Sequence, residues 1–534
     1  MRYSKAEGRA IRAIGETRTA RSTVRTIHGA FAERVAQRPE ATALIGIDRQ
    51  LSYTELDQES DAIAKQLSEA GVTEGCFVPV LLHRTPVLIA TLLAVLKCGA
   101  SYAALDPRWP EDRIAAILDQ LAPPVLVSTE SSAPRGIPVL SPDSPCSQSD
   151  LGRHEWPAVA PDAVAAVFFT SGTTGAPKGV LSSHTAATRL FTDGGLPGFD
   201  EAAVVSQTAP AAWDAFSLEV WGALTTGGTL VLSCDEYFLP SELAQLHDDH
   251  GVNCTWLTAS LFNLFVDSEL DCFTGIEHLY IGGERLSVDH VRRFLERFPE
   301  AKLFNGYGPV ESCVFATVHR ITLADCTGPA EVPIGQSVPE TEVHVRADGR
   351  PCQPGEVGEI LLGGSGLAHG YLGNPVLTAE RFPTVAIDDM PTRLYATGDR
   401  GSWDVDGVLH FHGRADRQIK IRGHRLELAE IERAARGLDE VAHCIVLPVT
   451  DHTGNIDRLA LAYTCRTPSI SQAALTAAEV SELRRQLARS LPDYAVPGVI
   501  LRLASLPTTA NGKLDQASLV KLVSDQAQKP SRPN

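Results

Sequence analysis

The sequence predicts an α/β fold of mixed α+β character, with a large N-terminal domain of βα-layered subdomains and a small, mobile C-terminal α/β domain. Strand-like apolar runs alternate with helical patterns, as in residues 77–82 followed by 87–96 and residues 228–233 followed by 241–250. This alternation is typical of sheets covered by helices. The pattern changes after residues 413–416, and helices expected at 428–436 and 480–490 would belong to the smaller domain.

Four segments are expected along the 534-residue chain. A basic N-terminal extension occupies residues 1–26, a large core 27–415, a small C-terminal domain 416–525 and a disordered tail 526–534. The extension is rich in arginine but lacks the apolar segment that a secretory signal needs. Residues 128–160 are rich in Pro, Ser, Asp and Gly, which predicts a surface crossing between two subdomains.

The composition excludes several classes of protein. Hydrophobic residues make up 44% of the chain and charged residues 21%, which are ordinary values for a globular protein. The formal net charge of −18 argues against broad contact with nucleic acid or with an anionic membrane. No apolar run reaches about 18 residues, so no membrane span is predicted. Eleven cysteines without a C-x-x-C pair favour reduced thiols in a cytoplasmic protein.

Residues 170–179 are the most informative segment. They combine four hydroxyl side chains, three glycines and a lysine, and they follow an apolar run at 164–169 that predicts a buried strand. A loop of this composition can wrap a polyphosphate, because glycine lets backbone amides approach closely and hydroxyls add hydrogen bonds. It is not a Walker loop, since Pro177 stands where the second glycine is needed. The alternative is a Gly/Thr-rich surface turn.

Nine further segments accompany this loop, and together the ten resemble, in order, the motifs of the adenylate-forming superfamily. That superfamily includes acyl-CoA synthetases, luciferases and nonribosomal peptide synthetase adenylation domains. The segments are LSYTEL (51–56), LKCGASYAALDP (96–107), WDAFSLEVWGAL (213–224), NGYGPVES (305–312), GEVGEILLGGSGLAHGYL (355–372), YATGD (395–399), GRADRQIKIRGHRLELAEIE (413–432), LPDYAVP (491–497) and NGKLD (511–515). The resemblance spans residues 27–520 and implies the adenylate-forming enzyme fold.

The resemblance also implies a reaction. ATP and a carboxylic acid form an acyl-adenylate with release of pyrophosphate, and a thiol then takes the acyl group. Two anions must be held together, which requires cations and oriented dipoles and no protein nucleophile. The resemblance assigns Lys178 to the β- and γ-phosphates, Lys513 to the substrate carboxylate and ribose-phosphate region, and Glu311 to Mg²⁺.

The nucleotide site follows from the same motifs. The implied ATP-binding residues are Thr170, Ser171, Gly172, Thr173, Thr174, Gly175, Lys178, Gly283, Asn305, Tyr307, Gly308, Asp399 and Arg414. Tyr307 would stack on adenine, and Asp399 would accept hydrogen bonds from both ribose hydroxyls. Val310 replaces the usual Thr, and the lost hydrogen bond of roughly 0.5–1.5 kcal/mol predicts slower adenylation.

Asp214 separates the subfamilies of this superfamily, because amino-acid-activating members carry an Asp here that pairs with the substrate α-ammonium. A buried carboxylate without a cation is costly, so its presence predicts an ammonium partner. The alternative is that Asp214 caps a helix that begins at Phe216.

The implied substrate pocket predicts a small aliphatic amino acid. Its residues are Asp214, Ala215, Leu218, Trp256, Tyr280, Gly282, Gly306, Val314 and Phe315, with Lys513 closing it. Its apolar wall resembles the valine-type pattern, in which Gly282 and Gly306 leave space and the Tyr280 hydroxyl could admit threonine. Valine, 2-aminobutyrate and isoleucine are not ranked, because one methylene changes binding by only ~1–3 kcal/mol.

The sequence therefore predicts an amino acid adenylation ligase that uses ATP and Mg²⁺ and then loads the phosphopantetheine thiol of a separate carrier protein. We expect a free-standing enzyme of nonribosomal peptide or antibiotic biosynthesis, since no carrier segment follows Lys513. Asp416 would be the hinge of the small domain, residues 422–424 would line the entrance for the phosphopantetheine arm, and basic residues within 417–425 could dock the carrier. Alternatives are an acyl- or aryl-CoA ligase, an enzyme forming an amide or dipeptide, and a catalytically silent ATP-binding homologue.

Overall fold

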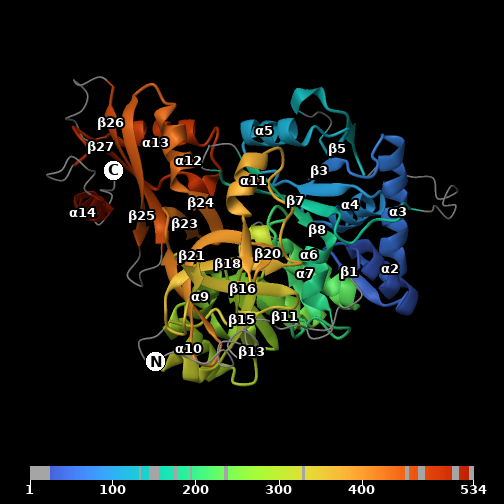
Figure 1. Cartoon of the computed structure of the whole chain (residues 1–534). Coiled ribbons are helices and arrows are strands. Elements are labelled where there is room, and N and C mark those ends of the chain that lie inside the picture. The colour runs from blue at the N-terminus through green and yellow to red at the C-terminus, as the bar shows by residue number, and fades with distance from the viewer. Residues whose placement is uncertain are drawn as a thin grey trace. The chain divides into compact units, whose positions relative to one another are not determined.

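The computed structural model (Figure 1) describes residues 25–130, 134–142, 156–172, 177–192, 195–233, 238–327, 331–450, 456–466, 475–507 and 516–527. Its internal contacts divide the chain into two compact units. The first unit comprises Met1–Pro107, Leu118–Phe169 and Gly179–Ala415, and the second comprises Arg108–Ile117, Thr170–Lys178 and Asp416–Asn534. Residues 1–24 of the expected extension, residues 528–534 of the expected tail and much of the expected crossing at 128–160 lie outside the described residues.

The largest sheet of the first unit has nine strands in the order β15-β14-β13-β12-β11-β9-β10-β1-β2. The strands are β1 (Thr42–Ile45), β2 (Gln50–Ser52), β9 (Val204–Gln207), β10 (Thr229–Leu232), β11 (Cys254–Thr258), β12 (His278–Gly282), β13 (Lys302–Tyr307), β14 (Thr317–Ile321) and β15 (Gln336–Ser337). The six strands in the middle of the sheet, β13, β12, β11, β9, β10 and β1, run parallel to one another. Strands β14 and β15 at one edge and β2 at the other pair antiparallel. The parallel strands therefore end at one common edge, where side chains from different strands can meet.

A second sheet of six strands has the order β6-β5-β3-β4-β7-β8. Its strands are β3 (Phe77–Leu81), β4 (Ser101–Ala104), β5 (Leu126–Ser128), β6 (Val139–Leu140), β7 (Val164–Thr170) and β8 (Lys178–Ser183). Helix α4 (Pro86–Lys97) follows β3, and helix α8 (Pro240–His250) follows β10, so both expected strand–helix alternations are confirmed. The buried strand expected before the glycine-rich loop is also confirmed, as β7.

A smaller antiparallel sheet has the order β17-β16-β18-β21-β22. Its strands are β16 (Thr341–Ala347), β17 (Arg350–Pro351), β18 (Gly358–Gly364), β21 (Tyr395–Trp403) and β22 (Leu409–Arg414), and a separate hairpin consists of β19 (Thr384–Ile387) and β20 (Met390–Arg393). The remaining helices of eleven residues or fewer in this unit are α2 (Ile27–Gln37), α6 (His184–Thr188), α9 (Ala259–Ser268), α10 (Val288–Arg297) and α11 (Pro375–Arg381). Helix α5 (Glu111–Leu121) is divided between the units, with residues 111–117 in the second and 118–121 in the first. The longer helices α3 (Tyr53–Glu69) and α7 (Ala215–Thr226) complete this unit.

Side-chain alternation divides the core of the nine-stranded sheet into two clusters. Trp256, Tyr280 and Phe304 lie in one cluster with the buried residues of α7, and we call this the α7 cluster. Their neighbours along β11, β12 and β13 (Leu257, Leu279, Ile281 and Leu303) lie in the other cluster, with residues of α8, α9 and α10. Because successive side chains of a strand point to opposite faces, the two clusters cover opposite faces of the sheet.

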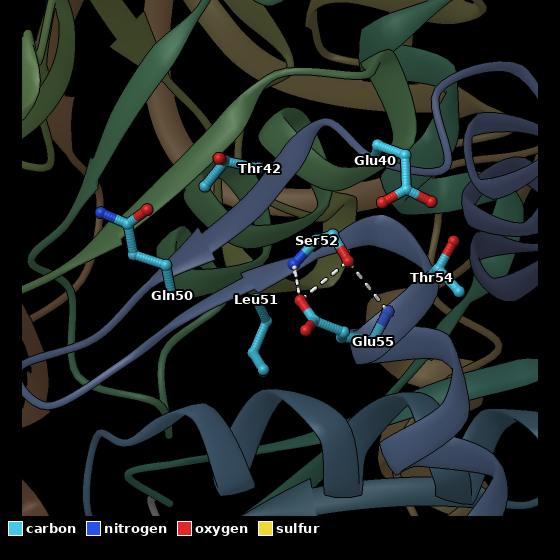
Figure 2. Close-up of a pocket in the computed structure, with 7 residues that line it drawn as sticks. All are labelled: Glu40, Thr42, Gln50, Leu51, Ser52, Thr54 and Glu55. Carbon is cyan, nitrogen blue, oxygen red and sulfur yellow. Dashed lines mark hydrogen bonds between the residues drawn. The ribbon is translucent and has the colours of Figure 1, made fainter.

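Helix α3 begins with a capping box, and a pocket of ≈ 320 Å³ lies beside it (Figure 2). Ser52 Oγ accepts the backbone N–H of Glu55, and the Glu55 carboxylate accepts the N–H and O–H of Ser52. The pocket is lined by Glu40, Thr42, Gln50, Leu51, Ser52, Thr54 and Glu55. None of the site residues expected from the sequence lines it.

The second unit contains the hairpin β23–β24 and the three-stranded sheet β25-β26-β27. Its elements are β23 (Gln418–Ile421), β24 (His424–Glu427), α12 (Leu428–Arg436), β25 (Val441–Thr450), β26 (Ile456–Cys465), α13 (Ala477–Leu487), β27 (Val499–Leu503) and α14 (Gln516–Ala527). The helix expected at 428–436 is confirmed as α12, and the helix expected at 480–490 is α13. Helix α13 begins earlier than expected because Thr476 and Glu479 form a capping box. Within the described residues, no helix has both the length and the apolar character that a membrane crossing requires.

Glu219 is a buried carboxyl on α7 that ties the helix to the segment following β9. Its side chain accepts hydrogen bonds from Gln207 Nε2 (3.1 Å), from the Thr208 N–H (3.0 Å) and hydroxyl (2.8 Å), and from the Ala209 N–H (3.0 Å). Burial, partly offset by these hydrogen bonds, raises the pKa of Glu219 from 4.5 to about 7.

We predict that the stability advantage of the wild type over Glu219→Gln falls as the pH rises from about 4.5 to about 7. In this window the unfolded carboxyl ionises while the folded one keeps its proton, so the unfolded state gains stability as the pH rises. Unfolding midpoints of both proteins, measured across this window, test the slope. Glu380→Gln serves as the control, because Glu380 is exposed with 65% of its side-chain surface accessible. A difference between wild type and Glu219→Gln that does not change with pH would contradict the prediction.

Candidate active site

Asp214 immediately precedes α7, but its side chain makes no capping hydrogen bond to the helix, which begins at Ala215. Instead, its Oδ2 atom accepts the backbone N–H of Val314 at 2.9 Å. The alternative that Asp214 serves as a helix cap is therefore wrong in this structure. Its carboxylate links the start of α7 to the loop that leads into β14.

This loop, residues 312–316, has an unusual backbone. It follows the 3₁₀ turn η5 (Val310–Ser312), and both Cys313 (φ 45°) and Val314 (φ 61°) adopt positive φ angles. Such angles are uncommon for any residue with a side chain and least favourable for a β-branched one. A Cβ atom on Gly308 would lie 2.3 Å from the carbonyl oxygen of Val314, so only glycine permits this close approach.

The structure brings the expected apolar wall residues together. Ala215, Leu218, Trp256, Tyr280, Val314 and Phe315 are all buried members of the α7 cluster. The Tyr280 ring stacks on Phe304 with centroids 4.7 Å apart and on Phe315 with centroids 6.1 Å apart.

Gly282 and Gly306 do not leave open space in the way expected. They are neighbours across β12 and β13, and a Cβ atom on Gly282 would lie 2.2 Å from the carbonyl oxygen of Gly306. A Cβ atom on Gly306 would lie 2.2 Å from the Phe315 ring. The space beside Gly282 is thus filled by the carbonyl group of Gly306, and the space beside Gly306 by the Phe315 ring. The two glycines permit these close contacts within the protein.

The hydroxyl of Tyr280 is already engaged. It donates a hydrogen bond to the carbonyl oxygen of Pro197 at 2.7 Å, and burial raises the pKa of this phenol well above its usual value. Its proton therefore bonds to Pro197, whereas its oxygen can still accept a hydrogen bond, so admission of threonine stays a prediction.

Three residues expected at the nucleotide form one hydrogen-bonded group. The Tyr307 hydroxyl donates to Asp399 Oδ2 at 2.6 Å, and Arg414 forms an ion pair with Asp399 Oδ1. Arg414 also donates to the carbonyl oxygen of Thr397 at 3.0 Å. Burial and the neighbouring Asp399 carboxylate raise the pKa of Tyr307, so this hydroxyl remains a proton donor at neutral pH.

Asn305 and Gly283, the other two residues expected beside the purine, lie near the carboxyl ends of β13 and β12. Asn305 is buried in β13 and donates through Nδ2 to the carbonyl oxygen of Pro333 at 2.7 Å. Gly283 follows β12 directly with φ 83°, a conformation that favours glycine. Both residues therefore border the carboxyl ends of the parallel strands.

Glu311 is fully buried, and its Oε1 atom accepts a hydrogen bond from the Tyr371 hydroxyl at 2.7 Å. Its carboxylate is a hard oxygen donor of the type that Mg²⁺ prefers. The described residues contain no group of three or more side chains that could hold a metal ion. This donor set fits an ion held by one carboxylate with nucleotide phosphates and water, which is a common arrangement for Mg²⁺.

The described residues of the glycine-rich loop belong to the second unit as far as Lys178, and Gly179 belongs to the first. Lys178 Nζ lies 3.7 Å from Glu427 Oε1, and the Ser171 hydroxyl donates to the carbonyl oxygen of Arg425 at 2.8 Å. Thr170 Oγ1 is buried without a hydrogen-bond partner among the described residues, and the backbone of Gly172 bonds to the Glu430 carboxylate. Thr173, Thr174, Gly175 and Lys513 lie outside the described residues.

The expected hinge residue, Asp416, is the first residue of the second unit after the core, and its Oδ1 accepts the N–H of Gln418 at 3.2 Å. The neighbouring turn between β23 and β24 has positive φ angles at Arg422 (50°) and Gly423 (81°). Two such residues form the turn type that two-residue hairpins prefer.

Sequence reasoning missed Arg189, a buried cation that contacts the loop 312–316. It also missed Glu427, which faces Lys178. The sequence carries little signal for either, because nothing in the chain order relates residue 189 to 312 or residue 178 to 427.

Comparisons with known proteins identify the family of this chain. The AMP-binding enzyme family matches residues 31–372, and the AMP-binding enzyme C-terminal domain matches residues 430–513. Malpibaldin synthetase of Mortierella alpina is 36% identical over 509 residues, which cover 92% of this chain and 9% of that protein. Tyrocidine synthase 3 of Brevibacillus parabrevis is 32% identical over 502 residues, which cover 92% of this chain and 8% of that protein. This chain thus spans only a small part of the length of these relatives.

One solved structure is similar to this chain over most of the length of both proteins. This structure is holo-PA1221, an NRPS protein that contains adenylation and PCP domains and is bound to a vinylsulfonamide inhibitor. Its TM-score is 0.84 and its sequence identity 32%, and the match covers 93% of this chain and 84% of that chain. The fold expected from the sequence, with a large N-terminal and a smaller C-terminal domain, is therefore confirmed. The chain belongs to the AMP-binding enzyme family and is an adenylate-forming ligase of the nonribosomal peptide synthetase type.

Proposed function

We propose that this protein activates a small aliphatic L-α-amino acid, such as valine or 2-aminobutyrate, as its aminoacyl-AMP. The observation that carries the proposal is Asp214, whose carboxylate adjoins the apolar α7 cluster and makes no helix cap. An anion in apolar surroundings is stabilised by a cation, and the α-ammonium of an amino acid supplies one. The apolar neighbours leave acidic and basic substrate side chains unpaired and therefore disfavour them.

The first step joins the substrate carboxylate to the α-phosphorus of ATP, and pyrophosphate leaves. Lys178 would hold the β- and γ-phosphates after exchanging its contact with Glu427 for the nucleotide. Asp399 would accept hydrogen bonds from the ribose hydroxyls, with Arg414 orienting the carboxylate. A Mg²⁺ ion on Glu311 would offset triphosphate charge when bound.

The second step would transfer the aminoacyl group to the phosphopantetheine thiol of a separate carrier protein, with AMP as the leaving group. The similarity to PA1221, which contains adenylation and PCP domains, supports a carrier partner. Rotation about Asp416 would bring residues 422–424 to the thiol entrance. Among the basic residues proposed for docking, Arg417 is bonded to Glu432 (2.9 Å) and Arg422 to the carbonyl oxygen of Asp457 (3.5 Å).

We predict ATP–pyrophosphate exchange with valine, 2-aminobutyrate or isoleucine, and none with the matched acids that lack the amino group. Asp214→Asn should raise the KM for the amino acid about tenfold or more, since a hydrogen bond to the charged form of this half-buried carboxyl contributes roughly 1.5–3 kcal/mol. Asp289→Asn is the matched control, because Asp289 has 67% of its side-chain surface exposed. Exchange with the deaminated acids would instead favour an acyl- or aryl-CoA ligase.

Gly306→Ala should narrow the pocket, because the new methyl group would overlap the Phe315 ring and displace it. We expect the KM for isoleucine and valine to rise more than that for 2-aminobutyrate, measured by the same exchange assay. Gly498→Ala is the control, since its Cβ atom would lie 3.5 Å from the nearest neighbour. An equal rise for all three amino acids would argue against Gly306 as a determinant of pocket size.

Lys513→Ala should suppress adenylation far more than thiol transfer from a preformed aminoacyl-adenylate. The reason is that the proposed role of this lysine is to bridge the two anions of the first step only. Exchange rates and single-turnover loading of a holo carrier protein measure the two steps separately. Comparable losses in both would exclude that role.

A further inference from the structure

Arg189 is a buried cation in the 3₁₀ turn η3 (Arg189–Phe191) of the first unit, with 1% of its surface exposed. In the described part of the chain, its guanidinium makes hydrogen bonds only to uncharged oxygen atoms. Nη2 donates to the carbonyl oxygens of Ser312 (2.9 Å) and Phe315 (2.7 Å), Nη1 to those of Ala186 and Cys313, and Nε to Thr341 Oγ1 (3.1 Å).

A buried guanidinium without a bonded carboxylate is an expensive arrangement, because the charge loses its hydration and gains only neutral partners. Burial lowers the pKa of Arg189 to about 10, so the side chain stays charged at neutral pH. Three of its five acceptors belong to the loop 312–316. The cation therefore stabilises chiefly that loop.

The loop needs such support because Cys313 and Val314 both have positive φ angles. Its carbonyl groups bond to Arg189, while the N–H of Val314 bonds to Asp214. The loop is thus held by a cation through its carbonyls and by an anion through an N–H.

We propose that Arg189 is a positioning residue for amino-acid recognition, which fixes the loop 312–316 so that the Val314 N–H orients the Asp214 carboxylate toward the substrate ammonium. This inference rests on the proposed amino-acid activation. Arg189 acts only through the loop, and its effect therefore requires Asp214.

Gly366 offers a second way to test the same side chain. A Cβ atom on Gly366 would lie 2.5 Å from Arg189 Cζ, so the backbone there packs directly against the guanidinium. Gly366→Ala would displace the guanidinium from its carbonyl partners without removing the charge.

The experiment is a double-mutant cycle on amino-acid-dependent exchange with Arg189→Met, Asp214→Asn and the combined variant. We expect Arg189→Met to raise the KM for the amino acid about tenfold, the equivalent of one lost charge-assisted hydrogen bond, and to change the KM for ATP much less. In the Asp214→Asn background the same substitution should have little further effect, because the group that it orients is gone.

Arg293→Met is the matched control, since Arg293 is half-exposed and pairs with Asp267 on the surface. Equal rises in both KM values, or additive effects of Arg189→Met and Asp214→Asn, would overturn the inference. If Arg189→Met does not fold, Gly366→Ala must show the same selective rise, and an unchanged amino-acid KM there would overturn it as well. A wild type that needs no amino acid for exchange would remove the proposed function itself, which is a distinguishable result.

Discussion

The bond between Asp214 and the Val314 N–H is the interaction on which the candidate pocket depends. It joins two segments that are a hundred residues apart, the start of α7 and the loop before β14. Without it, the carboxylate could turn back and cap its own helix, which is the usual role of Asp at this position. With it, the half-buried carboxylate is held beside the apolar α7 cluster, where a cation would stabilise its charge further.

Sheet topology explains why distant motifs meet. Strands β11, β12 and β13 run parallel, so their carboxyl ends share one edge of the sheet. The sequence after each strand, including Gly283 after β12 and Gly308 after β13, is therefore brought to the same place. Parallel α/β sheets bind ligands at this edge, and the order of the motifs along the chain follows the order of these strands.

The sequence predicted the elements better than the site. Apolar periodicity located α12 at its observed bounds and missed the start of α13 only because the Thr476 capping box was not recognised. Periodicity cannot say where a carboxylate points, so the Asp214 cap stayed an open alternative. Nor can it say what occupies the space beside a glycine, and at Gly306 that space holds the Phe315 ring.

Arg189 and Asp214 also show how a buried cation and a half-buried carboxylate can support the same loop without a salt bridge between them. Peptide groups of one loop lie between them, with carbonyl oxygens on the cation and an N–H on the anion. These dipoles stabilise both charges. A direct Arg–Asp pair would neutralise that carboxylate and remove its attraction for an ammonium. The separation of the two charges by a loop with positive φ angles at Cys313 and Val314 is therefore consistent with recognition of an amino acid.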